Sequence, residues 1–241
     1  MEGDRLSGPP PVVFFPGLLC DARLWGAQVE DLGARVRPWI ADFRRDDSIP
    51  AMARRALEEC PFDRFSLAGL SMGGYVAMEV MRQAPQRVER LALLDTQARD
   101  ESAEARERRL VLIRLGEEGR LDEVSERLMP LFLHASRLSD DRLTGLCRDM
   151  ARAVGRDAYL RQQKAILERV DSRASLAQVR CPTLVLCGDN DLLTPVDRHE
   201  EIAAAIPGAK LVKIRACGHM APLEKPTAVT QALEGWLGLA S

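Results

Sequence analysis

Residues 65–80, FSLAGLSMGGYVAMEV, join a strand-like segment to a helix-like segment with a serine at the corner. The apolar residues before Ser71 favour a buried strand, and the alanine, methionines and glutamate after it favour a helix. Gly69 and Gly73 flank the serine, and residues without a side chain let neighbouring backbones pass closely at a sharp turn. A G-x-S-x-G pattern in this context is typical of a nucleophilic serine at the tip of a sheet, although Ser71 could merely cap the helix.

The same alternation of short apolar runs and helical patterns extends along the chain. It predicts an α/β fold with a mostly parallel sheet of about six strands flanked by helices. Helices are expected after Ser48, after Ser71, from about Pro195 to Ile206 and from near Pro222 onward. The expected strands are residues 11–17, 35–41, 64–70, 90–95, 182–188 and 210–214.

Residues 97–179 interrupt this alternation, because they contain no strand-like run and read as amphipathic helices rich in Arg and Glu. Leu121, Val124, Leu128 and Leu131 recur at helical spacing, and a second stripe follows the expected cap Ser139. The strand pattern resumes near Cys181. We therefore expect a core of residues 1–96 and 180–241 with a helical insertion, 97–179, over one end of the sheet.

Composition narrows the class of function. The 241 residues carry 34 basic and 36 acidic side chains, a formal net charge of −2, which favours neither a nucleic-acid nor a membrane partner. A polar start without a basic leader or a membrane-spanning run predicts a cytoplasmic protein. The six cysteines lack C-x-x-C spacing and are expected to be free thiols. With three dispersed histidines, no metal site is expected. The preference for arginine over lysine suggests a bacterial genome rich in GC.

A serine nucleophile needs a base and an acid from loops at the same edge of the sheet. The chain supplies both in the order serine, acid, histidine. GDNDLLTP places Asp189 and Asp191 after the strand expected at 182–188, and His219 follows the strand expected at 210–214. Asp95, at the end of another expected strand, is an alternative acid. The remaining histidines have less specific settings: His134 is expected at the surface or in packing, and His199 on a solvated helix face.

Three motifs, PGLLCDARLW, GLSMGG and GDNDLLTP…GHMAPLEKP, make the chain resemble α/β-hydrolase-family enzymes over nearly its whole length. The resemblance implies that Ser71 is the nucleophile, that Asp191 orients the imidazole and that His219 is the general base and then the general acid. It also implies that the insertion is a lid. The oxyanion hole would use the Met72 N–H and, by the same resemblance, the Leu18 N–H, although Pro16 stands where many relatives have histidine.

These roles imply two-step acyl transfer without a cofactor, on a small-molecule ester with a small to medium acyl group. The expected pocket walls are apolar, with Leu19, Trp25, Met129, Phe132 and Leu133 beside the oxyanion residues. Cleavage of a carbon–carbon bond, a lactone or a thioester stays open on the same fold. So does a ligand-binding role without catalysis. The oligomeric state is not indicated by the sequence.

Overall fold

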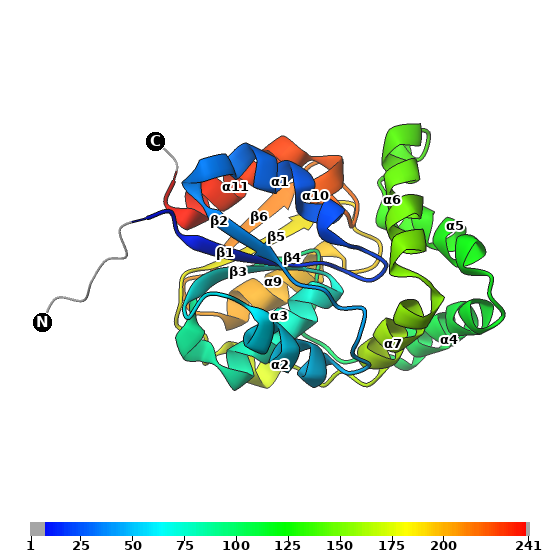
Figure 1. Ribbon diagram of the computed structural model, residues 1–241, viewed down its shortest axis with the longest axis horizontal. Coiled ribbons are helices and arrows are strands. Elements are labelled where there is room, and N and C mark those ends of the chain that lie inside the picture. Colours follow the sequence, from blue (N-terminus) through cyan, green and yellow to red (C-terminus); the bar gives the residue numbers. More distant parts are fainter. Residues whose placement is uncertain (1–7, 240–241) are drawn as a thin grey trace, which may run out of the picture.

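The computed structural model describes residues 8–239, in which six strands form one sheet with the order β2-β1-β3-β4-β5-β6 (Figure 1). Every neighbouring pair is parallel, which confirms the predicted sheet. The second strand is shorter than the expected 35–41, and the fourth begins before residue 90. The strands are β1 Pro11–Phe15, β2 Arg37–Ile40, β3 Phe65–Leu70, β4 Val88–Leu94, β5 Thr183–Gly188 and β6 Lys210–Ile214.

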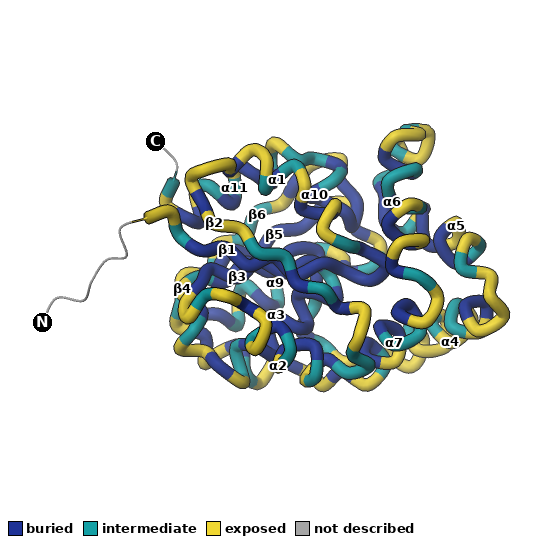
Figure 2. Tube along the Cα trace, in the orientation of Figure 1, coloured by how far each residue is buried: buried dark blue, intermediate teal, exposed yellow. Residues whose placement is uncertain are grey.

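Helices cover both faces of this sheet (Figure 1). One face carries α1 Gly26–Leu32, α10 Ala221–Glu224 and α11 Pro226–Leu237, and the other carries α2 Ile49–Glu59, α3 Met72–Gln83 and α9 Val196–Ala205. Because both faces are covered, β1, β3 and β5 are buried along their whole length, and Figure 2 shows this buried centre. Short 3₁₀ turns lie at Ala22–Trp25, Gly33–Arg35, Pro85–Arg87 and Ala135–Arg137.

Capping residues explain where several helices begin. The Ser48 hydroxyl accepts a hydrogen bond from the Ala51 amide at 3.4 Å and starts α2 as expected. The cap expected at Ser139 is wrong by one residue, since Asp140 accepts from the Leu143 amide at 3.2 Å. The helix predicted from near Pro222 onward is two helices. Pro222 lies in α10, and the apolar stripe of the predicted helix lies in α11, which begins at Pro226.

The chain between β4 and β5 contains the predicted helices. They are α4 Ala103–Glu117, α5 Leu121–Phe132, α6 Asp141–Val154, α7 Arg156–Leu167 and α8 Arg173–Leu176. In Figure 1, α4 to α7 lie beyond the carboxyl ends of the strands, at the end of the molecule away from both termini. We call α4 to α7 the helical insertion; its role as a lid stays a prediction.

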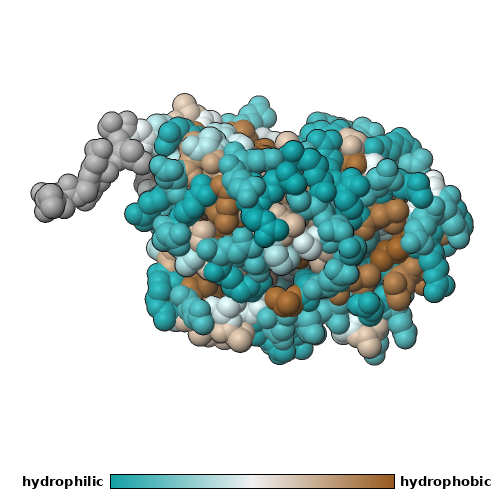
Figure 3. All heavy atoms as spheres, turned by 60° about the horizontal axis from the view of Figure 1, so that its bottom comes forward, coloured by the Kyte–Doolittle hydropathy of each residue, from teal (hydrophilic) through white to brown (hydrophobic). Residues whose placement is uncertain are grey.

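The surface is mostly hydrophilic in the view of Figure 3, with apolar groups toward the end formed by the helical insertion. Many exposed arginines of the insertion are paired, among them Arg127 with Glu123 at 2.8 Å and Arg152 with Asp122 at 2.9 Å. All six cysteines are free, and five of them are buried. Within residues 8–239, no helix combines the length and apolarity that crossing a membrane requires.

Close packing around Gly73 leads to a stability prediction. A Cβ at this position would lie 2.3 Å from the backbone oxygen of Phe15, so Gly73→Ala is expected to destabilise the fold by about 2 kcal/mol or more. Gly145 is the matched control, because it also lies in a helix and a Cβ there meets nothing within 4 Å. Gly145→Ala should leave stability unchanged or raise it by up to about 1 kcal/mol. Urea unfolding measures both, and equal stabilities would contradict the packing argument.

Candidate active site

Ser71 occupies the turn between β3 and α3 in a conformation that non-glycine residues rarely adopt, with φ 54° and ψ −115°. Such backbone strain costs about 1–3 kcal/mol and persists where surrounding contacts fix it. Here the Ser71 amide donates to the Leu94 carbonyl at 3.0 Å, and the Thr96 hydroxyl donates to the Ser71 carbonyl at 2.8 Å. The Ser71 side chain makes no capping bond to α3. Its hydroxyl is therefore available for another partner.

That partner is His219. The Ser71 Oγ lies 2.8 Å from His219 Nε2, and His219 Nδ1 lies 2.8 Å from Asp191 Oδ2. The histidine and the aspartate are buried, whereas Ser71 is partly exposed. Since a carboxylate only accepts hydrogen bonds, Nδ1 carries a proton and Nε2 is left to accept from the serine hydroxyl. The three side chains that the sequence singled out are thus brought together in one hydrogen-bonded chain.

Asp191 is fixed by its own loop. Its Oδ1 accepts from the Leu193 and Thr194 amides at 2.8 and 3.0 Å, and its Oδ2 accepts from the Thr194 hydroxyl at 2.6 Å. Burial alone would raise the pKa of this carboxyl, but the charge and hydrogen bond of His219 and the Thr194 bonds outweigh it and lower the pKa. Asp191 is therefore ionised at neutral pH.

The loop that carries His219 is attached to the helical insertion. The Phe132 carbonyl, at the end of α5, accepts from the His219 and Met220 amides at 3.0 and 3.1 Å. The Phe132 ring stacks on the imidazole with centroids 6.1 Å apart. The buried Glu224 accepts from the Gly218 amide at 2.9 Å and from the His134 amide at 2.8 Å. Phe132 thus contacts the imidazole directly, whereas Glu224 fixes the backbone next to it.

Thr194 and Glu224 are residues that the sequence reasoning did not assign, although both lie inside the quoted motif GDNDLLTP…GHMAPLEKP. Burial raises the pKa of Glu224, against the lowering effect of its backbone hydrogen bonds. His134 is partly exposed, which fits the expected surface position, and its ring Nδ1 caps the turn Ala135–Arg137 by accepting from the Ser136 amide at 3.2 Å.

A narrow pocket of about 10 Å³, room for about one water molecule, lies beside Ser71 and His219. Neither the Leu18 nor the Met72 N–H has a hydrogen-bond acceptor among residues 8–239, and their place in an oxyanion hole stays a prediction. The other residues that line the pocket are Gly17, Leu18, Cys20, Leu70, Phe132 and Met220.

Of the predicted pocket walls, only Phe132 belongs to this lining. Leu19, Met129 and Leu133 are buried but do not line it. Trp25 is fully buried with its ring 5.0 Å from that of Phe14. A substrate role for these four residues stays a prediction.

The two alternative acids do not contact His219. Asp189 is exposed and lies 3.5 Å from the Cys217 amide. Asp95 is fully buried and accepts from the Gly188 amide at 3.0 Å and the Ala221 amide at 3.3 Å. Burial, together with the nearby charge of Asp191, raises the pKa of Asp95 well above its usual range. The surroundings of the two carboxyls thus shift their pKa values in opposite directions.

His199 corrects a sequence expectation, because it is fully buried and not on a solvated face. Its Nε2 accepts from the Thr96 amide at 2.8 Å, and its Nδ1 lies 3.3 Å from the Pro195 carbonyl. Thr96 is the residue that bonds the Ser71 carbonyl, so His199 supports the serine turn from behind. The charged neighbours in VDRHEEI suggested an exposed helix, and a single inward-facing polar residue gives no periodic signal.

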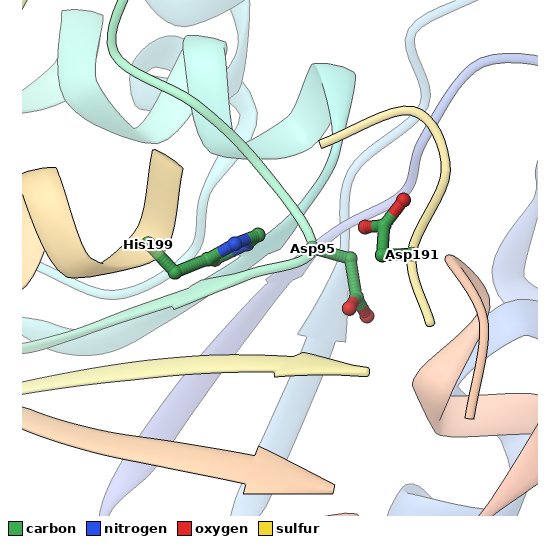
Figure 4. Close-up of side chains that lie close together, drawn as sticks. All are labelled: Asp95, Asp191 and His199. Carbon is green, nitrogen blue, oxygen red and sulfur yellow. The ribbon is translucent and has the colours of Figure 1, made fainter. Parts of the chain in front are cut away.

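Figure 4 shows His199 reaching from α9 toward Asp95 and Asp191. Potential ligand atoms of these three side chains lie within 4.8 Å of one another, as a metal site requires. Protein donors already bind them: the Thr96 amide binds His199, backbone amides bind both oxygens of Asp95, and His219 and Thr194 bind Asp191. We therefore interpret the group as a buried hydrogen-bonded framework behind the serine.

The family follows from comparison with known proteins. A family model described as the alpha/beta hydrolase fold matches residues 10–226. The chain belongs to the α/β-hydrolase family. A solved structure of a thermophilic esterase from Thermogutta terrifontis is 30% identical, with a TM-score of 0.87 over 96% of this chain and 90% of that one.

Two relatives similar to this chain over most of its length are named for different substrates. A pimeloyl-[acyl-carrier protein] methyl ester esterase of Nitrosomonas europaea is 29% identical over 90% of this chain and 91% of its own length. A protein provisionally named a carbamate hydrolase, from Azorhizobium caulinodans, is 28% identical over 95% of this chain and 91% of its own length.

The buried His199 predicts a loss of stability in acid. Burial lowers its pKa from the ordinary 6.5 to about 4, so between these values the unfolded chain binds the proton that the folded protein excludes. Above pH 6.5, His199 is neutral in both states and does not change the free energy of unfolding. As the pH falls from 6.5 toward 4, the free energy of unfolding decreases. His199→Gln keeps an acceptor but does not titrate. From pH 7.5 to 4.5 the free energy of unfolding should therefore fall by about 2–3 kcal/mol more in the wild type than in the variant.

Urea unfolding at the two pH values measures this difference, and the other titrating groups cancel because both proteins carry them. Equal losses in the wild type and in His199→Gln would show that His199 is protonated without cost in the folded protein.

Proposed function

We propose that the protein is a serine hydrolase that cleaves carboxylic esters through an acyl-enzyme on Ser71. The observation that carries the proposal is the chain of two 2.8 Å contacts from Ser71 through His219 to Asp191. A strained serine, a histidine base and an ionised, buried carboxylate are the parts that acyl transfer requires.

In the first step, Ser71 Oγ attacks the ester carbonyl while His219 Nε2 takes the hydroxyl proton. The carbonyl oxygen becomes an oxyanion, which the N–H groups of Leu18 and Met72 stabilise. Asp191 stabilises the imidazolium, which then gives its proton to the departing alkoxide, so that an alcohol leaves and the acyl group stays on Ser71. Water repeats the sequence with His219 as base, and the carboxylic acid is released.

The pocket favours a small, uncharged acyl group. Leu18, Leu70, Phe132 and Met220 line it with apolar atoms, and it is narrow, at about 10 Å³. The names of the esterases similar to this chain agree with ester cleavage. Carbamate cleavage is the second candidate, because the same serine can attack a carbamate carbonyl and a similar chain is provisionally named for that substrate. The helical insertion, which touches the His219 loop through Phe132, is proposed as the lid.

Hydrolysis of p-nitrophenyl esters tests the proposal. The wild type should cleave the acetate and butanoate esters, and the rate should fall for longer acyl chains because the pocket is small. Ser71→Ala should lower kcat at least about 1000-fold, since removing the nucleophile disables the triad as a unit. Release of p-nitrophenolate at pH 8 gives both rates, and the melting temperature of each protein shows whether the variant is folded.

Clear wild-type turnover that persists in folded Ser71→Ala would overturn the serine mechanism. Absence of turnover on every ester, combined with release of p-nitrophenolate from a p-nitrophenyl carbamate that depends on Ser71, would favour the carbamate candidate.

A further inference from the structure

The loop after β1, residues 16–20, carries the Leu18 N–H and contains a second strained residue. Leu19 has φ 59°, in the left-handed region that favours glycine. The Cys20 amide closes the turn by donating to the Gly17 carbonyl at 3.2 Å. The Cys20 thiol also donates to the Leu18 carbonyl, at 3.4 Å. Both bonds lie within the loop, so neither ties it to the rest of the molecule.

Gln162, on α7 of the helical insertion, supplies a contact from outside this loop. Its Oε1 accepts from the Leu19 amide at 3.1 Å, and its Nε2 donates to the Phe43 carbonyl at 3.2 Å. The side chain is 1% exposed, so its amide is a buried group bonded at both ends. It joins the insertion to two loops at the carboxyl edge of the sheet, the one after β1 and the one after β2.

We propose that Gln162 is a positioning residue for the oxyanion hole. The Leu19 amide belongs to the peptide plane that immediately follows Leu18, so fixing this plane restricts the orientation of the preceding plane, which carries the Leu18 N–H. The inference rests on the proposed function. It implies that the insertion takes part in building the catalytic centre, because the contact is lost whenever α7 moves away from the loop.

Gln163 provides a matched control on the same helix. It has the same side chain and is fully buried, but its Oε1 accepts from Arg109 at 2.6 Å and its Nε2 donates to Tyr159 at 2.8 Å. Both partners lie within the insertion. Gln162→Leu and Gln163→Leu therefore each remove one buried amide from α7, and only the first removes a contact to the oxyanion loop.

The test measures the rate at which a fluorophosphonate probe labels Ser71, because this reaction does not depend on the natural substrate. Ser71 Oγ forms a bond to phosphorus, the P–F bond breaks, fluoride leaves and the serine proton passes to His219. Charge that develops on the phosphonyl oxygen needs the same N–H donors. Removing one oxyanion donor typically costs about 100- to 1000-fold in rate, so a misdirected donor in Gln162→Leu should slow labelling at least about tenfold.

Gln163→Leu should label within about twofold of the wild type. In ester hydrolysis, Gln162→Leu should lower kcat with little change in KM, because the lost interaction belongs to the transition state. Its pH profile should be unchanged, since the contacts of His219 are untouched. Gln162→Glu, whose buried carboxyl in the neutral form keeps one acceptor and one donor, should label within about fivefold of the wild type and serves if the leucine variant does not fold.

Folded Gln162→Leu that labels as fast as the wild type would overturn the inference. So would an equal slowing of Gln162→Leu and Gln163→Leu, which would indicate general loosening of the insertion, or a more than tenfold slowing of Gln162→Glu at a native melting temperature. If the wild type shows no labelling that depends on Ser71, the proposed function itself fails, and the role of Gln162 fails with it.

Discussion

The strained turn at Ser71 is the constraint on which the rest of the site depends. A left-handed serine between β3 and α3 costs about 1–3 kcal/mol, and the structure offsets this by packing and hydrogen bonding on every side. Gly69 and Gly73 make room for the crossing backbones. The Leu94 carbonyl accepts from the Ser71 amide, and the Thr96 hydroxyl donates to the Ser71 carbonyl. His199 in turn accepts from the Thr96 amide. The serine is thereby presented to His219 without using its own hydroxyl for support.

Two buried carboxyl groups near the active site have different surroundings, which shift their pKa values in opposite directions. Asp191 and Asp95 are both buried near the same sheet edge, but His219 and Thr194 lower the pKa of Asp191, whereas Asp95 accepts only from backbone amides and burial raises its pKa. The carboxyl that contacts the imidazole, at 2.8 Å, is therefore the one whose pKa is lowered. Asp191 is also the acid that the family resemblance implied, and the two alternatives, Asp189 and Asp95, do not contact His219.

The sequence predicted the layout of the fold because buried parallel strands appear as continuous apolar runs and amphipathic helices repeat their apolar residues at helical spacing. The sheet, the helical insertion and the meeting of Ser71, Asp191 and His219 all follow from short motifs with fixed positions relative to strand ends. Glu224, His199 and Gln162 could not be found in this way. Each is a polar side chain buried among apolar ones, and its role depends on partners up to 143 positions away that only the folded structure identifies. The cap at Asp140 was missed because Ser139 precedes it with equal capping tendency.

In the proposed mechanism, Ser71 carries the acyl group between two chemical steps. Mass spectrometry of the protein, quenched in acid during hydrolysis of a slowly turned-over p-nitrophenyl ester, tests it most directly. A mass increase equal to the acyl group less the one hydrogen it replaces is expected on the peptide that contains Ser71, and is expected to be absent from Ser71→Ala. Turnover without any adduct, or an adduct on another residue, would contradict it.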